Sequence, residues 1–366
     1  MKLVRDIWRI TWRLGVCALL LGWVAHTIFL NEGRLAWAGH ETAWTALSRS
    51  EQWRLAWSRG PLELWHKLRL IRPAAGLLSL VFMGATIFLG MLRWRMVLRV
   101  QRLELSLARA TEISLVAHFF NSFLLGSTGG DLMKAYYAAR ETHHLKTEAV
   151  VTVFVDRLLG LLSMLVFAAV MMAPNLALLR AHRRLAALAA LILLMLLGGG
   201  LVTVLSFWGG LSQRWPGARV WLRRLPRAAL LERSLEACRR FGRARAFLWR
   251  AFGLSMILNA ACVLQVWSLA RGLDLAIDPV ALFVIVPVII CIAALPITPS
   301  GLGVRENLYV WMLAVPEINV PATQALSLSL LAYAGSLCWS LVGGLVYATF
   351  RDRHRLTEFV HADAAG

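Results

Sequence analysis

Long apolar runs recur along the chain, and they restrict the possible folds more than any other feature does. Runs of roughly 18 residues or more suit helices that cross a bilayer. Inside lipid, backbone groups must pair within a helix or a closed barrel. The chain is 59% hydrophobic, well above a soluble domain. The sequence therefore predicts an all-α polytopic membrane protein. Six full spans are expected, over residues 14–30, 74–92, 149–173, 185–208, 251–270 and 325–350.

Basic residues give the expected orientation in the membrane. The formal net charge is +19, and the basic residues lie mainly between the apolar runs. Basic loops tend to face the cytoplasm and to attract anionic lipids, which explains the charge better than nucleic-acid binding does. The basic loop 209–250 and the short tail 351–366 lie on the cytoplasmic side in this interpretation. We expect a multi-pass protein of the inner (cytoplasmic) membrane, with both termini in the cytoplasm and no nucleic-acid partner.

Residues 1–73 are predicted to form the first span and a tryptophan-rich connection. Tryptophan among basic residues prefers the headgroup zone, so we expect amphipathic helices on the outer interface, with a surface that also suits a protein partner. A signal peptide cleaved after Ala36-Trp37-Ala38 is the alternative to an uncleaved first span. The tryptophans of the connection are Trp37, Trp44, Trp53, Trp57 and Trp65.

Two further apolar segments, 113–130 and 280–315, are interrupted by glycine, proline or polar residues. The first is flanked by basic residues at both ends. It is therefore predicted to enter and leave the membrane from the cytoplasm, with an ordinary span as the alternative. If both termini lie inside, the number of full crossings is even, so the second segment must enter and return on the outer face.

These segments form two similar units, residues 74–173 and 251–350, within a transmembrane domain over residues 74–350. Each unit contains a span, a broken re-entrant helix and another span, and the two units have opposite orientations. This is the inverted-repeat plan of many secondary transporters, which hold their substrate near the midplane with discontinuous helices.

Each break is predicted to precede a half-helix. The start of a helix presents unpaired N–H groups and the positive end of the dipole, and glycine lets a ligand approach the backbone. Such places favour phosphate and other anions. The candidate substrate-binding or gating residues are Asn121, Gly126, Ser127, Thr128, Gly129, Gly130, Asp131, Lys134, Asp156, Arg157, Pro299, Ser300, Gly301, Gly303, Arg305 and Glu306.

Charged side chains inside a bilayer cost roughly 2.5–3.5 kcal/mol each, so they are functional by default. The alternative is structural ion pairing, for example of Asp131 or Glu306 with Arg157. Lys134 is expected to pair with Asp131, three residues before it. The lone His118 is expected to be a satisfied core residue.

Nucleotide, metal and cofactor sites are not indicated. Asp131 follows Gly130 where a P-loop would have lysine, and Gly301-x-Gly303 lacks both the third glycine and the preceding strand of a dinucleotide fingerprint. His143-His144 has no carboxylate or cysteine spaced to complete a metal site. We therefore expect no cofactor, no metal ion and no catalytic residues.

Three motifs occur in a specific order. They are Gly129-Gly130-Asp131-x-x-Lys134, Val155-Asp156-Arg157-x-x-Gly160 and Pro299-Ser300-Gly301-Leu302-Gly303-Val304-Arg305-Glu306. In order and spacing, over about residues 74–350, the chain resembles the lysylphosphatidylglycerol synthase transmembrane region, also called the flippase-like domain family. The resemblance implies a polytopic inner-membrane protein. In the full synthases this region is thought to flip aminoacylated lipid between leaflets.

The sequence ends sixteen residues after Phe350, with no room for the soluble aminoacyl-transfer domain of the synthases, so lysyl transfer is not expected. The leading hypothesis is a non-enzymatic lipid translocase that moves a phospholipid or related anionic lipid between leaflets. One alternative is an integral-membrane enzyme that modifies a lipid or polyprenyl headgroup. Another is a non-catalytic membrane assembly factor.

Overall fold

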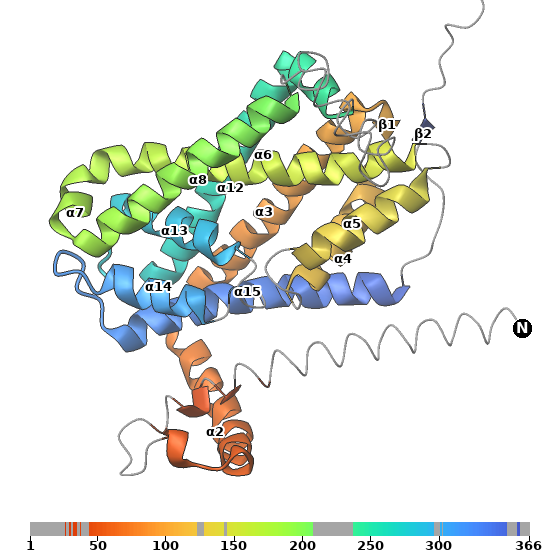
Figure 1. Ribbon diagram of the computed structural model, residues 1–366. Helices are drawn as coiled ribbons and strands as arrows, with labels where there is room; N and C mark the ends of the chain where they lie inside the picture. Colours follow the sequence, from red (N-terminus) through yellow and green to blue (C-terminus); the bar gives the residue numbers. More distant parts are fainter. Residues whose placement is uncertain are drawn as a thin grey trace, which may run out of the picture.

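The computed structural model describes residues 26, 29–30, 32–34, 37, 44–122, 128–142, 145–207, 237–295, 301, 303–349 and 357–358. Helices make up almost all of this part of the chain (Figure 1). Its strands are two short segments, β1 (Leu103–Glu104) and β2 (Thr357–Glu358), which pair antiparallel. The predicted all-α class is confirmed.

Five of the described helices are long and apolar enough to cross a membrane. These helices are α3 (Pro73–Val100), α6 (Lys146–Met172), α8 (Arg183–Phe207), α12 (Arg245–Gly272) and α15 (Ala322–Thr349). They match the five predicted spans that follow the first one. The first predicted span, 14–30, lies outside the described residues except for residues 26, 29 and 30. Most of the predicted loop 209–250 and of the tail 351–366 also lies outside them.

Both predicted breaks separate two helices. The first lies between α4 (Leu107–Asn121) and α5 (Thr128–Glu141), and the second between α13 (Pro279–Ala293) and α14 (Val304–Leu313). Of the break residues, 123–127, 296–300 and 302 lie outside the described part of the chain. The side from which each broken segment enters the membrane stays a prediction.

The α4–α5 pair is an antiparallel hairpin, as contacts at its two ends show. At the open end, Arg109 of α4 forms an ion pair of 2.6 Å with Glu141 of α5, and both side chains are almost fully buried. At the break, Asn121 Oδ1 accepts a hydrogen bond of 2.7 Å from the Gly130 amide. A hairpin that pairs its own backbone and charges in this way suits a segment that enters and leaves on one side.

Helices α3 and α12 lie antiparallel along each other and form the centre of the molecule. The Arg72 amide donates to the Gly272 carbonyl at one end (3.1 Å), and the Arg93 guanidinium donates to Ser255 Oγ nearer the other end (3.0 Å). In Figure 1, α3 and α12 cross between α6 and α15, which lie on opposite sides of the bundle.

The helix contacts repeat when the two units are exchanged. Helix α4 packs on α15 of the other unit, and the corresponding α13 packs on α6. Likewise, α5 contacts α6 in the first unit, and the corresponding α14 contacts α15 in the second. Helix α3 contacts the hairpin helix α4 and the last helices of both units, α6 and α15. The corresponding α12 contacts the hairpin helix α13 and the same two helices. With α3 and α12 antiparallel, this is the contact pattern of an inverted repeat. Helix α8 and the short α7 (Leu176–Ala181) lie outside the repeat, after the 3-10 turn η2 (Ala173–Asn175).

Close contact between the units requires a small residue at Gly343 in α15. A Cβ atom there would overlap the carbonyl oxygen of Leu115 in α4. Because the obstacle is backbone, it cannot rotate away. Gly343 therefore sets how closely the first hairpin approaches the last helix.

The connection before the first repeat contains η1 (Trp44–Ala46) and α2 (Arg49–Leu70), which begins with a capping box between Ser48 and Glu51. Helix α2 projects from the bundle (Figure 1). Trp53, Trp57 and Trp65 are 51–55% exposed on it. Exposed tryptophans suit the predicted headgroup zone, and the location of α2 at an interface stays a prediction.

Candidate functional site

A cavity of about 450 Å³ lies between the two repeat units. Each of the helices α3–α6 and α12–α15 contributes at least one residue to its lining. This central cavity is continued by a smaller space of about 140 Å³, which shares Asp131 and Asp156 with it and is also lined by Lys134. A volume of this size is in the range of small-molecule binding sites.

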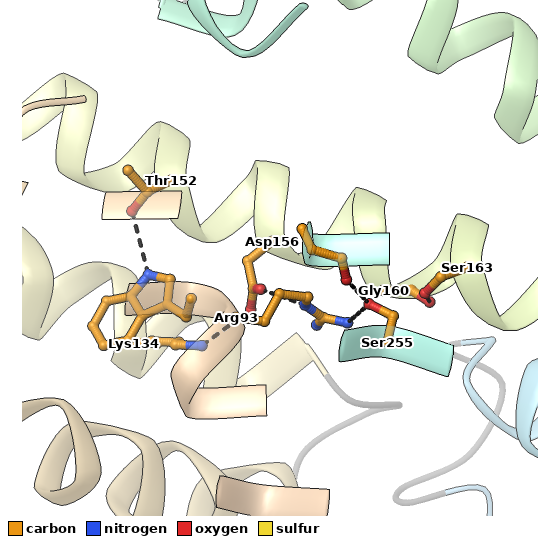
Figure 2. A network of polar contacts seen from close by, with 9 residues as sticks. Arg93, Lys134, Thr152, Asp156, Gly160, Ser163 and Ser255 are labelled. Carbon is orange, nitrogen blue, oxygen red and sulfur yellow. Dashed lines mark hydrogen bonds and ion pairs between the residues drawn. The ribbon is translucent and has the colours of Figure 1, made fainter. Parts of the chain in front are cut away.

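A buried ion cluster lies beside the cavity. Asp156 accepts a hydrogen bond of 2.8 Å from Arg93 Nε and one of 3.1 Å from Lys134 Nζ. Figure 2 shows Lys134 on one side of Asp156, and Arg93 with Ser255 on the other. The three charged side chains are only 9–11% exposed. Because they come from α3, α5 and α6, the cluster connects three helices of the first unit.

Neighbouring residues hold the two cations of this cluster in place. The ammonium of Lys134 lies 4.4 Å from the ring centre of Trp94, a cation–π distance, and Trp94 in turn donates a hydrogen bond of 3.3 Å to Thr152. At Gly160 a Cβ atom would lie 2.8 Å from Arg93 Nη2. Gly160, four residues after Asp156, therefore leaves the space that the guanidinium of Arg93 occupies.

A second, more exposed ion pair faces the cavity. Arg157 Nε lies 3.5 Å from Asp131 Oδ2, and the two side chains are 30% and 31% exposed. The predicted pairing of Asp131 with Arg157 is confirmed. The predicted pairing of Lys134 with Asp131 is wrong, because Lys134 points across to Asp156 on α6 instead of along its own helix.

At the first break, glycine allows α5 to begin tightly against α4. A Cβ atom at Gly130 would overlap the carbonyl oxygen of Ala117, and the Gly130 amide already donates to Asn121. Thr128 and Gly129 form the first residues of α5. Gly126 and Ser127, and the side chain of Thr128, lie outside the described residues.

At the second break, Gly301 and Gly303 have φ values of +69° and +83°, a left-handed conformation that favours glycine. Glu306 Oε2 accepts a hydrogen bond of 2.6 Å from the Gly303 amide, and its other oxygen accepts one of 2.6 Å from Arg305. Glu306 is thus buried as the cap of its own helix and does not line the central cavity. Pro299 and Ser300 lie outside the described residues.

Arg305 does line the cavity. Its guanidinium lies 4.5 Å from the ring centre of Tyr333 and donates to Ser329 Oγ at 3.2 Å. With Arg93 and Arg157 it makes three arginines in the lining against two aspartates, a net charge of +1 with histidine neutral.

Three guanidinium groups line the cavity. Anion binding at the two helix starts stays a prediction; one amide at each start already donates to a side chain of the protein, Gly130 to Asn121 and Gly303 to Glu306. Planar guanidinium groups bind phosphate and carboxylate oxygens in pairs. The site therefore suits an anionic group held by side chains.

Residues 45–343 match the family model of the Lysylphosphatidylglycerol synthase TM region. The chain belongs to this family. It is therefore a multi-pass membrane protein of a family related to lipid handling. A search of curated proteins found no match. The match begins at residue 45 and so includes α2, which lies before the region expected from the three motifs.

In this family member, the three sequence motifs converge on one cavity. Asp131 comes from the first motif, Asp156 and Arg157 from the second, and Arg305 from the third, and all four line the central cavity. They lie on α5, α6 and α14, so residues up to 174 positions apart in the sequence share one space.

The cavity residues that were not among the predicted site residues include Arg93, His118 and Asn259. Arg93 lies just beyond the predicted span 74–92, but α3 continues to Val100 and buries it. His118, predicted to be a core residue, lines the cavity and donates from Nε2 to the Ser336 carbonyl at 3.2 Å. Asn259 lines it too, and its buried Nδ2 has no hydrogen-bond partner among the described residues. The sequence feature that could have identified Asn259 is a single amide side chain within an apolar span.

Within the described part of the chain, no group of three or more His, Cys, Asp or Glu side chains could hold a metal ion. The cavity lining instead offers arginine and amide donors together with two carboxylates. This donor set suits an organic or phosphate-bearing ligand.

Proposed function

We propose that this protein is a lipid translocase that moves a phospholipid or a related anionic lipid between the leaflets of the inner (cytoplasmic) membrane. The observation that carries the proposal is the central cavity, which both repeat units line and which has three arginines against two aspartates. A site shared by two units of opposite orientation is the usual place for alternating access. The basic loops support cytoplasmic termini.

In this mechanism the headgroup phosphate binds Arg157 and Arg305. The side chains of these residues are 30% and 15% exposed, whereas that of Arg93 is 11% exposed and donates to both Asp156 and Ser255. Arg93 therefore adds positive potential, and the other two provide direct contacts. The unpaired Nδ2 of Asn259 donates to a further headgroup oxygen, which removes the cost of a buried donor without a partner.

The Asp131–Arg157 pair acts as a gate between α5 and α6. At 3.5 Å and nearly one-third exposed, it is a weaker contact than the buried Asp156 cluster, since exposed ion pairs contribute only about 0–1 kcal/mol. A phosphate that binds Arg157 competes with Asp131 and loosens the start of α5 from α6. The buried cluster holds the rest of the two helices together while this happens.

The test is a scrambling assay in reconstituted liposomes, with a fluorescent anionic phospholipid and dithionite quenching of the outer leaflet. Wild-type protein is expected to expose inner-leaflet lipid faster than empty liposomes do, and Arg157→Ala to slow the exchange. Arg250→Ala is the matched control, because Arg250 is exposed on α12 and does not line the cavity. If wild-type protein scrambles no faster than empty liposomes, the proposal is wrong.

An enzyme that acts on a lipid or polyprenyl headgroup is the second candidate. The observation in its favour is that His118 and Asp131 line the same cavity, since such residues serve as general acids and bases. Lipid analysis of a deletion strain separates the two candidates. A lost lipid species favours the enzyme, while unchanged lipids with altered leaflet exposure favour the translocase.

A further inference from the structure

A second groove, of about 480 Å³, lies over α5 and α6. We call it the lateral groove; the lining residues used below are Leu132, Tyr136, Arg140, Lys146 and Val150. It shares no residue with the central cavity. The same two helices therefore present one set of residues to the cavity and another to the groove.

The groove is basic at one end. Arg140 and Lys146 are its charged lining residues, and no acidic residue lines it. Lys146 is exposed and forms no ion pair with any described residue. Arg140 lies at the end of α5 and Lys146 at the start of α6, so both cations are at the same end of this helix pair.

Tyr136 adds a hydrogen-bond donor beside these cations. Arg140 Nη1 donates to the Tyr136 hydroxyl oxygen at 2.6 Å, and the guanidinium lies 5.4 Å from the ring centre. Since the hydroxyl oxygen accepts that bond, its own hydrogen is directed elsewhere. The Tyr136 side chain is 49% exposed, so this hydrogen can reach a ligand oxygen.

The other end of the groove is apolar. Leu132 is 69% exposed and Val150 43%, and Phe154, one turn beyond Val150 on α6, is 55% exposed. Leu132 precedes Arg140 by eight residues, and Phe154 follows Lys146 by eight, so each helix separates its apolar and basic ends by about 12 Å. The antiparallel ion pairs Lys134–Asp156 and Asp131–Arg157 align the two apolar ends with each other.

We propose that the lateral groove binds an anionic phospholipid of the surrounding bilayer. The phosphate lies between Arg140 and Lys146 and accepts a hydrogen bond from Tyr136, and an acyl chain lies along Leu132, Val150 and Phe154. Charge complementarity favours this occupant over a zwitterionic lipid, because the groove holds two cations and no carboxylate. The site is distinct from the central cavity and does not depend on the function proposed for that cavity.

The test uses the full-length protein in nanodiscs that contain a trace of phospholipid with a photoactivatable acyl chain. One sample carries the probe as phosphatidylglycerol and the other as phosphatidylcholine. After irradiation, labelled peptides are quantified by mass spectrometry. The anionic probe is expected to label peptides with Leu132, Val150 and Phe154 about tenfold more than the zwitterionic probe does.

Two variants make this result specific. Arg140→Gln/Lys146→Gln is expected to reduce anionic labelling to the zwitterionic level, whereas Arg183→Gln/Arg184→Gln, which alters two exposed arginines at the start of α8, leaves it unchanged. Tyr136→Phe keeps both charges and is expected to lower labelling by a smaller factor. Equal labelling by the two probes, or full labelling of the glutamine variant, overturns the proposal.

A last arm separates the groove from the translocase proposal. Arg305→Ala alters the central cavity from α14, which contributes no residue to the lateral groove, and is expected to leave labelling of the groove unchanged. Wild-type protein that scrambles no lipid but still labels specifically at the groove refutes the translocase alone. Scrambling without specific labelling refutes the lipid groove alone.

Discussion

Asp156→Asn tests whether the buried ion cluster stabilises the first repeat unit. The amide keeps the shape of the side chain and removes its charge, which leaves Arg93 and Lys134 buried beside a neutral group. Each hydrogen bond to a charged acceptor contributes about 1.5–3 kcal/mol, and Asp156 accepts two, at 2.8 and 3.1 Å. We expect a loss of about 3–5 kcal/mol in the free energy of unfolding, the range for breaking a buried ion pair.

The assay is denaturant unfolding of the purified protein in detergent micelles. Asp274→Asn is the matched control, because it breaks a shorter ion pair, 2.6 Å to Arg72, in which both side chains are 68–69% exposed. Such an exposed pair contributes about 0–1 kcal/mol. The double variant Asp156→Asn/Lys134→Met removes one of the two stranded cations and is expected to recover part of the loss.

The comparison between Asp156→Asn and Asp274→Asn tests whether a buried ion pair stabilises the protein more than an exposed one does. If Asp156→Asn and Asp274→Asn lower the free energy of unfolding by the same amount, burial gives the cluster no special role. If the double variant is less stable than Asp156→Asn alone, Lys134 is not a stranded cation, and the reasoning is refuted in that respect too.

Three further outcomes are expected. Gly343→Ala places a Cβ atom against the Leu115 carbonyl and should lower thermal stability in detergent by about 1–3 kcal/mol, whereas Gly198→Ala, with open space around it, should not. Gly303→Ala forces a side chain into φ +83°, costs about 1–3 kcal/mol, and should lower both thermal stability and scrambling. The pKa of the exposed Glu317 carboxyl lies below its usual value, because its own backbone amide and then His182 donate to it. This contribution to stability is present above the ordinary glutamate pKa and is lost as pH falls through the lowered one. The Glu317→Gln variant should therefore show a smaller drop in melting temperature than the wild-type protein over that acidic range. An equal drop in both proteins would contradict this.

The helices and breaks could be predicted because they depend on local composition. Apolar runs long enough to span a bilayer set α3, α6, α8, α12 and α15, and glycine and proline set the breaks. Their ends were less predictable. The apolar run of α3 stops at Leu92, but the helix continues to Val100, because a buried carboxylate from another helix compensates Arg93.

The residues of the candidate site were easier to predict from the sequence than the ion pairs between them. Asp131, Asp156, Arg157 and Arg305 do line one cavity, since charges within apolar segments must gather away from lipid. Lys134 was assigned to the wrong carboxylate, because spacing along one helix reveals nothing about the α6 side chain opposite it. The capping role of Glu306 could have been recognised in the sequence, because a glutamate three residues after Gly303 is in the position of a reciprocal helix cap.

The exchange of hairpins between the units has a consequence for how the protein assembles and moves. Because α4 packs on α15 and α13 packs on α6, each half of the chain completes the other, much as two protomers do in a domain-swapped dimer. Neither half encloses the cavity alone, so two co-expressed fragments should associate, while a single fragment should be degraded. We also expect the interlocked hairpins to oppose rigid-body rocking of one half against the other.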